Sequence, residues 1–301
     1  MTRSKRALVP IMFVAMASAM SGCGDRTPSE AKPDDDGEQA EEKAPALSGS
    51  LKVIGSNTVT PVSTAWAEGF MKHNPKVNVS ISGPGSGPGI AAVIDGTTDI
   101  GQSSRSIRPA EIEKARAKGR EVVETIIAWD GLALVVNRNN PINELTLEQL
   151  AGIYLGGITN WKDVGGSDTR IVATSRDTAS GTHAYFKKEV LSDAEFSQDV
   201  LFLPSTSTGV TEVSRNAGAI FYAGLGYVTD DVKVIGLKKD AGATAVKPSI
   251  PTVNDKSYPL ARPLYYYTDG APAGLAKAFI EYGMSREGAK LVEKMGFVPL
   301  P

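Results

Sequence analysis

Three turns rich in glycine and hydroxyl residues recur along the chain, and each lies between a short apolar strand and an amphipathic helix. The first turn joins residues 51–54 to 61–73, and the second joins 77–81 to 90–94. The third follows residues 171–173. Strands and helices that alternate in this way predict an α/β fold with a mostly parallel sheet. In such a sheet ligands bind at the carboxyl ends of the strands, which is where the turns lie.

The third turn is the most specific of the three. Residues 175–183 read Ser-Arg-Asp-Thr-Ala-Ser-Gly-Thr-His and run into a segment, 184–191, with the apolar spacing of a helix. Ser180 or Thr182 is therefore expected at a helix N-terminus, where backbone N–H groups lack partners and the helix dipole adds positive charge. Together with the guanidinium of Arg176, these groups form a site for a tetrahedral oxyanion. The alternative is an ordinary N-cap beside a solvated arginine, and the stretch alone favours that alternative.

Length and charge limit the classes of function. The chain has 301 residues, a formal net charge of −2 and 41% hydrophobic residues, so it can form a sizeable core in one large or two medium domains. It has no basic stripe with interleaved aromatic residues, which argues against a nucleic-acid partner. Two scattered histidines and one cysteine offer no cluster of metal ligands, and we expect neither a metal nor another cofactor.

The N-terminus resembles a lipoprotein signal peptide. A basic segment, residues 3–6, precedes an apolar run, 7–19, that is too short to span a bilayer comfortably. Small residues then lead to Cys23, the only cysteine, in a pattern that resembles a bacterial lipobox. We expect residues 1–22 to be removed and Cys23 to carry lipid. The alternative is a plain signal peptide with an incidental cysteine.

A polar segment follows the lipobox. Residues 23–48 are rich in Asp, Glu, Lys, Pro and Ala, and they cannot bury enough apolar surface to fold. We expect a disordered acidic tether that ends where the folded body begins, near Gly49. The single cysteine excludes an intrachain disulfide.

Two segments of the body are expected to cross between domains. Residues 122–128 form a strand that reaches an Asp-Gly pair at 130–131, and residues 132–136 form a buried strand that crosses into a second domain. The chain returns at residues 258–267. Two crossing strands predict a hinge about which the domains close on a ligand.

The crossings divide the body into two lobes. Lobe 1 is expected to comprise residues 49–133 and 260–301, and lobe 2 residues 134–259. Within lobe 2 we expect a helix at 193–200 and a surface hairpin and loop at 242–253.

Six motifs follow one another along the body. In chain order they are Gly55-Ser56-Asn57-Thr58, Gly85-Ser86-Gly87, residues 99–105, residues 156–161, Arg176 with Ser180-Gly181-Thr182, and residues 258–265. Their order and spacing resemble the periplasmic phosphate-binding proteins of Pst-type ABC importers. The resemblance covers the chain from Gly49 to Pro301. It implies the type II periplasmic-binding-protein fold, with two α/β lobes and a two-strand hinge, and a receptor rather than an enzyme.

The resemblance also implies a phosphate site that both lobes share. The residues assigned to it are Ser56, Asn57, Thr58, Ser86, Ser104, Arg105, Arg176, Ser180, Gly181 and Thr182. Two positions depart from the family. Asn57 stands where a hydroxyl residue is common. Ser104 stands where one branch has a carboxylate, and here the chain resembles the branch with Ser-Ser-Arg.

Ser104 is a poor discriminator between phosphate and sulfate. Near neutral pH phosphate keeps a proton and sulfate keeps none, so a fixed acceptor favours phosphate. A serine hydroxyl can instead turn to donate. We therefore expect Asp130, at the carboxyl edge of the sheet, to be the acceptor. The alternative is a residue that caps the Asp-Gly turn.

The sequence thus predicts a monomeric, lipid-anchored receptor, in the periplasm or on the outer face of the cell membrane, that binds inorganic phosphate and delivers it to a Pst-type ABC permease. One alternative is a receptor for sulfate or another tetrahedral oxyanion. The other is a secreted phosphate-ester hydrolase with Ser180 as nucleophile and His183 as base. No third group that would orient His183 is evident in the sequence.

Overall fold

The computed structural model describes residues 46–300. The expected signal peptide, the lipidation site Cys23 and all but the last three residues of the expected tether lie outside this range.

The described residues form a mixed α/β body on one ten-stranded sheet. The strands are β1 (Gly49–Gly55), β2 (Val77–Ser82), β3 (Ile100–Ser103), β4 (Val122–Asn137), β5 (Glu144–Thr146), β6 (Val172–Arg176), β7 (Leu201–Leu203), β8 (Ala219–Gly224), β9 (Val232–Lys238) and β10 (Ala261–Asp269). The helices are α1 (Thr60–His73), α2 (Ser86–Asp95), α3 (Pro109–Ala117), α4 (Leu147–Tyr154), α5 (Gly181–Leu191), α6 (Thr206–Arg215), α7 (Ile250–Asn254), α8 (Gly274–Met284) and α9 (Arg286–Lys294). The strand order is β2-β1-β3-β10-β4-β8-β6-β7, and β9 pairs with both β4 and β5.

The sheet is antiparallel around β4 and β10 and parallel on both sides of them. In lobe 1, β1 pairs in parallel with β2 and β3, and in lobe 2, β6 pairs in parallel with β7 and β8. The described pairs that include β4 or β10 are all antiparallel. The expectation of a mostly parallel sheet therefore holds only for the strands away from β4 and β10.

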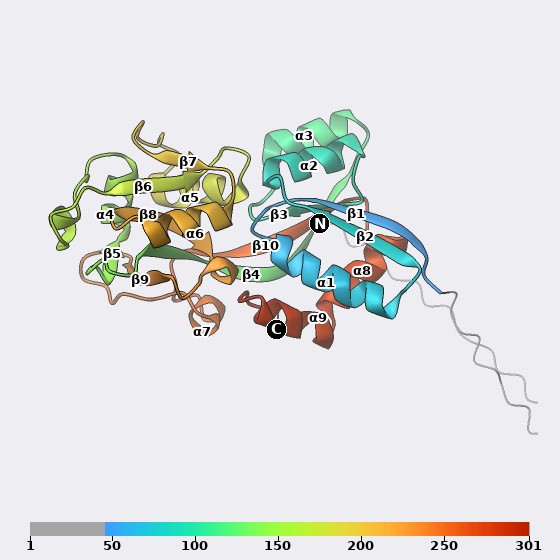
Figure 1. Cartoon of the computed structure of the whole chain (residues 1–301). Coiled ribbons are helices and arrows are strands. Elements are labelled where there is room, and N and C mark those ends of the chain that lie inside the picture. Colours follow the sequence, from blue (N-terminus) through green and yellow to red (C-terminus); the bar gives the residue numbers. More distant parts are fainter. Residues whose placement is uncertain (1–45, 301) are drawn as a thin grey trace, which may run out of the picture. The chain divides into compact units, whose positions relative to one another are not determined.

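Strand β4 is the first crossing between the lobes. Its first part, from Val122 to Gly131, pairs with β10, and its second part, from Leu132 to Asn137, pairs with β8 and β9. Figure 1 shows β4 and β10 side by side between the two lobes. The predicted break at residues 130–131 is wrong, because both residues continue the ladder with β10 and Asp130 lies opposite Arg262.

The second crossing lies beside the first. The N–H of Leu132 donates to Leu260 O at 2.9 Å, and the hydroxyl of Tyr258 donates to Leu132 O at 2.6 Å. These contacts fasten the returning chain to β4 just before β10 begins. Two adjacent strands therefore carry the connection between the lobes.

Helices cover both faces of the sheet in each lobe. In lobe 1, α2 and α3 lie on one face and α1, α8 and α9 on the other (Figure 1). Trp66 of α1 meets Tyr266 of β10 edge to face, with ring centroids 5.9 Å apart. In lobe 2, Phe186 of α5 stacks on Tyr222 of β8 at 4.0 Å. Each lobe thus has its own apolar core, which allows the lobes to move as units.

Two expectations for lobe 2 need correction. Residues 193–200 are not a helix, because Ser192 and Asp193 have positive φ angles of 51° and 65° and end α5 there. The loop expected at 242–253 contains the start of a short helix, α7. Strand β9 was not predicted from the sequence.

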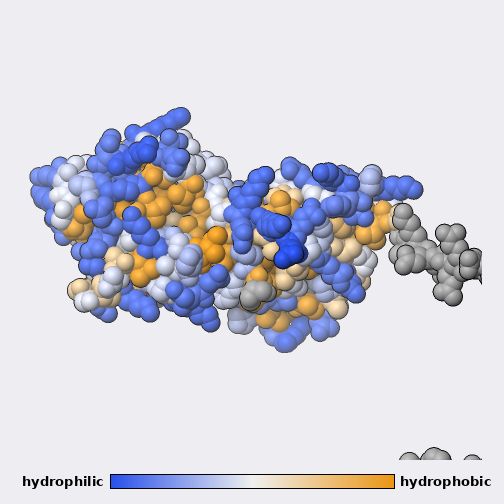
Figure 2. Space-filling model, turned by 90° about the horizontal axis from the view of Figure 1, so that it is seen from below, coloured by the Kyte–Doolittle hydropathy of each residue, from blue (hydrophilic) through white to orange (hydrophobic). Residues whose placement is uncertain are grey.

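The surface of the body is mixed. Figure 2 shows polar residues and patches of apolar residues interspersed over one face. Among residues 46–300, no helix combines the length and the apolar character that a membrane span requires.

Candidate oxyanion-binding site

The first turn, at the carboxyl end of β1, is hydrogen-bonded to β3. The N–H of Ser56 donates to Gln102 O at 2.7 Å, and Nε2 of Gln102 donates to Ser56 O at 2.9 Å. This double contact fixes the backbone that carries Asn57 and Thr58. The side chains of Ser56 and Thr58 are buried.

The second turn places Ser86 at the N-terminus of α2. The preceding Gly85 has φ +132°, and a Cβ there would lie 2.5 Å from the carbonyl oxygen of Ala179 in lobe 2, so the position requires glycine. The N–H of Ser104, which follows β3, donates to Ser86 Oγ at 3.0 Å. Ser86 and Ser104 are therefore neighbours in lobe 1.

The third turn places Ser180 as the N-cap of α5. Its Oγ accepts from the N–H groups of Thr182 and His183 at 3.2 and 3.3 Å. A Cβ on Gly181 would lie 2.2 Å from Ser86 Oγ. The N-termini of α2 and α5 thus meet across the boundary between the lobes.

Five buried hydroxyls from the three turns and the end of β3 form what we call the hydroxyl cluster. Its members are Ser56, Thr58, Ser86, Ser104 and Thr182. Thr58 Oγ1 and Thr182 Oγ1 are 2.8 Å apart, and Ser104 Oγ lies 3.0 Å from Ser56 Oγ and 3.4 Å from both Ser86 Oγ and Thr182 Oγ1. Each hydroxyl can rotate to donate, and the two helix dipoles add positive potential at the same place. The cluster is therefore suited to an anion with several acceptor oxygens.

Arg176 is almost fully buried and bonds to Asn57, the residue between two members of the cluster. Its Nη1 donates to Thr206 Oγ1 at 2.9 Å and to Asn57 Oδ1 at 3.3 Å, and its Nη2 donates to Pro204 O at 2.9 Å. Burial lowers the pKa of the Arg176 guanidinium, and the carboxylate of Asp177 opposes this effect. Because the guanidinium bonds to residues of both lobes, it links them.

Asn57 acts here as an acceptor. Its Oδ1 receives the N–H of Thr206, the first residue of α6, at 3.1 Å, in addition to Nη1 of Arg176. The hydroxyl of Tyr227 donates to the Asn57 backbone oxygen. Asn57 of lobe 1 is thus anchored to lobe 2 at several points.

Asp130 and Arg262 form a buried ion pair on the two hinge strands. Nε and Nη2 of Arg262 donate to Asp130 Oδ2 at 3.0 and 2.8 Å, and the Leu225 N–H donates to Asp130 Oδ1 at 3.0 Å. Burial raises the pKa of the Asp130 carboxyl, while the charge and hydrogen bonds of Arg262 act against the rise. Asp130 therefore does not cap a turn.

Arg262 also reaches both lobes. Its Nη1 donates to Ser104 O at 3.2 Å and its Nη2 to Thr182 Oγ1 at 3.0 Å. The sequence reasoning did not find this residue. The sequence signal that could have pointed to Arg262 is its charge, because it lies inside a strand that is otherwise mostly apolar and buried.

Arg105 is not part of the hydroxyl cluster. Its guanidinium forms an ion pair with Glu111, with Nη2 and Oε1 2.6 Å apart. It lines a pocket of about 560 Å³ that also contains Arg262, Tyr185 and Lys188. This pocket lies beside the cluster, with Ser104 and Arg262 in the wall between them.

His183 is not placed as a base for Ser180. Its Nδ1 lies 2.9 Å from Arg176 O, which can only accept, and its ring stacks on Phe196 at 4.7 Å. The described contact between the two residues runs from the His183 backbone N–H to Ser180 Oγ. This geometry gives no support to the hydrolase alternative.

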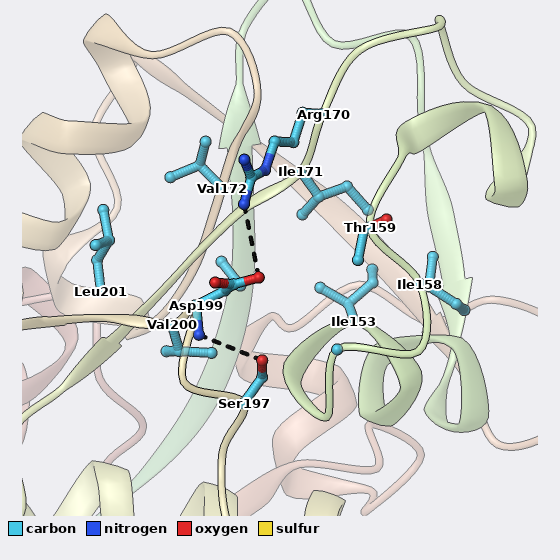
Figure 3. Close-up of a pocket in the computed structure, with 12 residues that line it drawn as sticks. Ile153, Ile158, Thr159, Arg170, Ile171, Val172, Ser197, Asp199, Val200 and Leu201 are labelled. Atoms are coloured by element: carbon cyan, nitrogen blue, oxygen red, sulfur yellow. Dashed lines mark hydrogen bonds and ion pairs between the residues drawn. The ribbon is translucent and has the colours of Figure 1, made fainter.

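A separate pocket of about 270 Å³ lies within lobe 2 (Figure 3). Apolar side chains such as Ile153, Ile158 and Ile171 line it, and an exposed ion pair, Arg170 with Asp199 at 3.6 Å, lies beside them. Its lining does not include the residues of the hydroxyl cluster.

Comparisons with known proteins place the chain in a family. The model of the PBP superfamily domain matches residues 40–287. The phosphate-binding protein PstS of Bacillus subtilis is 34% identical over 301 residues, which cover 100% of this chain and 95% of that protein. The PstS of Pseudomonas aeruginosa is 32% identical over 277 residues, or 86% of each chain.

Solved structures agree with this assignment. A protein from Clostridium perfringens, described as a phosphate ABC transporter substrate-binding protein with bound phosphate, has a TM-score of 0.76 and 32% identity, over 84% of this chain and 100% of that one. An ABC-type phosphate transport receptor from Vibrio cholerae has a TM-score of 0.68 and 31% identity, over 83% and 100% of the two chains. The predicted type II periplasmic-binding-protein fold is confirmed. The chain belongs to the PBP superfamily and, within it, to the family of the PstS phosphate-binding proteins.

Proposed function

We propose that the protein captures inorganic phosphate between its lobes, outside the cytoplasmic membrane, and delivers it to a Pst-type ABC permease. The observation that carries this proposal is the meeting of the α2 and α5 N-termini with five buried hydroxyls drawn from both lobes. Helix N-termini favour anions, and converging donors suit a tetrahedral one. The PstS relatives from Bacillus subtilis and Pseudomonas aeruginosa are phosphate-binding proteins, and the structure from Clostridium perfringens holds phosphate.

The proposed ligand residues come from both lobes, which we divide as 49–133 plus 260–301 and 134–259. They are Ser56, Asn57, Thr58, Ser86 and Ser104 of lobe 1 and Arg176, Ser180, Gly181 and Thr182 of lobe 2. Hydroxyls that hydrogen-bond to one another can turn their O–H groups to the anion when it arrives. Arg105 is left out, because Glu111 occupies its guanidinium.

Asp130 is the proposed acceptor for the proton of phosphate. Its Oδ2 receives two N–H groups from Arg262, whereas its Oδ1 receives only the Leu225 N–H among the described contacts. A carboxylate oxygen has two lone pairs, so Oδ1 retains capacity for one more donor. A cleft with a fixed acceptor favours phosphate over sulfate.

The proposed location depends on a lipid anchor at Cys23. We also propose that the protein acts as a monomer. Mass spectrometry of the mature N-terminus is expected to find a diacylated Cys23. A mature N-terminus that carries no acyl chain would contradict the anchor.

Isothermal titration calorimetry against phosphate and sulfate at equal ionic strength tests the ligand. We expect phosphate to bind more tightly than sulfate. Tighter binding of sulfate would reassign the ligand within the tetrahedral oxyanions, and binding of neither anion would contradict the proposed function.

A further inference from the structure

Arg262 lies where the two hinge strands meet the hydroxyl cluster. It is opposite Asp130 in the β4–β10 ladder, and its side chain is 1% exposed. Two of its N–H groups bind Asp130 Oδ2. The aspartate balances the charge of a guanidinium removed from water, which makes its burial tolerable.

The remaining donors of this guanidinium face the two lobes. Nη1 donates to Ser104 O in lobe 1, and Nη2 donates to Thr182 Oγ1 in lobe 2 at 3.0 Å. Thr182 Oγ1 in turn lies 2.8 Å from Thr58 Oγ1. One edge of the guanidinium therefore belongs to the hydroxyl cluster.

The acceptors that Arg262 meets in the cluster are neutral. A hydrogen bond from a guanidinium to an ionised oxygen is roughly twice as strong as a bond between neutral groups, so an anion is a better partner than the Thr182 hydroxyl. Moreover, one of the two N–H groups on Nη1 has no acceptor within residues 46–300. Arg262 thus has N–H donors that the ion pair with Asp130 does not use and that an anion can accept.

Arg176, by comparison, makes its described bonds outside the cluster. Its acceptors are the backbone oxygens of Leu203 and Pro204 and the side chains of Thr206 and Asn57. Among the described contacts, Arg262, unlike Arg176, donates a guanidinium hydrogen bond to a hydroxyl of the cluster, that of Thr182.

We propose that Arg262 binds the captured phosphate directly, as a second arginine beside Arg176. This inference rests on the proposed phosphate-binding function. An anionic oxygen replaces Thr182 Oγ1 as the acceptor of the Nη2 N–H, and the Thr182 hydroxyl turns to donate to the anion. Asp130 holds the guanidinium plane in place. Because every tetrahedral oxyanion offers such an oxygen, Arg262 supplies affinity, whereas Asp130 supplies the choice between phosphate and sulfate.

Calorimetry of two variants separates these roles. Arg262→Lys keeps a charge opposite Asp130 but loses the planar fork, so the affinities for phosphate and sulfate are both expected to fall by about 10-fold or more, with little change in their ratio. Asp130→Asn is expected to change the ratio. Arg120→Lys is the matched control, because Arg120 pairs with Asp269 at the other end of β10. It is expected to bind as the wild type does.

A second measurement needs only the wild-type protein. Heteronuclear NMR detects a coupling through a hydrogen bond between the phosphorus of bound phosphate and a guanidinium nitrogen. We expect this coupling for Arg262, and a merely structural role does not produce it. Wild-type affinity in Arg262→Lys, or bound phosphate without the coupling, would overturn the role of Arg262 alone. A wild-type protein that binds neither anion would overturn the proposed function and this inference with it.

Discussion

Arg176 joins the lobes through a single side chain. It ends β6 in lobe 2, where it holds the oxygens of Leu203, Pro204 and Thr206, and it also reaches Asn57 of lobe 1. Because these bonds fix the guanidinium plane, little side-chain entropy remains to be lost when an anion binds. The residue therefore combines charge with an orientation that is set in advance.

Replacement of Arg176 tests this role. Arg176→Ala is expected to weaken phosphate binding by about 2 kcal/mol or more, because a buried guanidinium interacts strongly with an anion. Arg176→Lys is expected to recover part of the loss, since a point charge does not reproduce the fork. Arg170→Ala is the control, because its exposed ion pair lies on the surface. Calorimetric affinities equal to the wild type in Arg176→Ala would contradict the assignment.

His183 makes the stability of lobe 2 depend on pH. Burial lowers its pKa below the ordinary value of 6.5, although the hydrogen bond to Arg176 O acts in the other direction. Below pH 6.5 the unfolded chain takes up a proton that the folded chain does not. The free energy of unfolding therefore falls as the pH drops from 6.5 toward the lowered folded pKa.

His183→Gln is expected to reduce this loss of stability, because glutamine has no proton to gain and can still donate to Arg176 O. Urea unfolding of both proteins at about pH 7.5 and about pH 5.5 measures the effect. If acidification lowers the unfolding free energy of both proteins equally, His183 is not the group responsible.

At the scale of residues, the sequence predicts the hydroxyl residues of the site but does not point to Arg262, which donates a hydrogen bond to one of them. Ser86, Ser180 and Thr182 were found because each belongs to a local pattern, a turn that opens a helix. Arg262 has no local pattern. Its role comes from the register that brings it opposite Asp130, 132 positions earlier in the chain, and no short-range signal encodes that pairing.

The N-termini of α2 and α5 are the elements that form the site. They approach so closely that Gly181 has no room for a side chain, since an added Cβ would lie 2.2 Å from Ser86 Oγ and 2.8 Å from Ser104 Oγ. Both of these atoms belong to lobe 1. The glycine is therefore required for contact between the lobes and not for the helix itself.

Gly181→Ala is expected to weaken phosphate binding without destabilising the fold. Alanine is favoured over glycine in helices, whereas overpacking at the closed interface costs about 1–3 kcal/mol. The open state avoids this overpacking cost and the closed, phosphate-bound state does not. The cost therefore lowers the affinity for phosphate. Gly87→Ala in α2 is the matched control, because its added Cβ would meet nothing closer than Ala179 O at 3.6 Å. Equal affinities of the two variants would contradict the close approach.

Elements with regular patterns were predicted more reliably than those decided by tertiary contacts. The helix expected at 184–191 lies within α5 and ends at the same residue, Leu191. The segment 193–200 has helix-forming residues, but Phe196 packs on His183 and Phe186, and these contacts replace a helix. The Asp130-Gly131 pair is typical of turns and predicts a break between the strands 122–128 and 132–136. The ladder with β10 and the bonds from Arg262 keep it extended.

At the scale of the molecule, contacts at the edges of the cleft connect the two lobes. Besides the hydroxyl cluster, the N–H of Gly87 in α2 donates to Ala179 O of lobe 2 at 3.2 Å, and Asn57 bonds to α6 and Arg176. Further bonds between the lobes join Tyr227 to Asn57, Leu225 to Asp130 and Arg262 to Thr182, and the strand pair β4 and β10 carries the chain from one lobe to the other. A hinge of two strands permits rotation. The hydrogen bonds between the lobes oppose that rotation by about 1 kcal/mol net each, or somewhat more where a guanidinium or carboxylate takes part.

Phosphate is therefore expected to shift the molecule toward its closed state. A ligand that bonds to both lobes binds the closed state more tightly than the open one, and the population follows that difference in affinity. Small-angle scattering is expected to give a smaller radius of gyration when phosphate is added to the wild type. Gly181→Ala is expected to show a smaller change at the same phosphate concentration, because its methyl group separates the helix N-termini that the anion draws together. If the wild-type radius stays the same although calorimetry shows phosphate bound, the lobes do not close in response to the ligand, and the cross-lobe contacts hold without it.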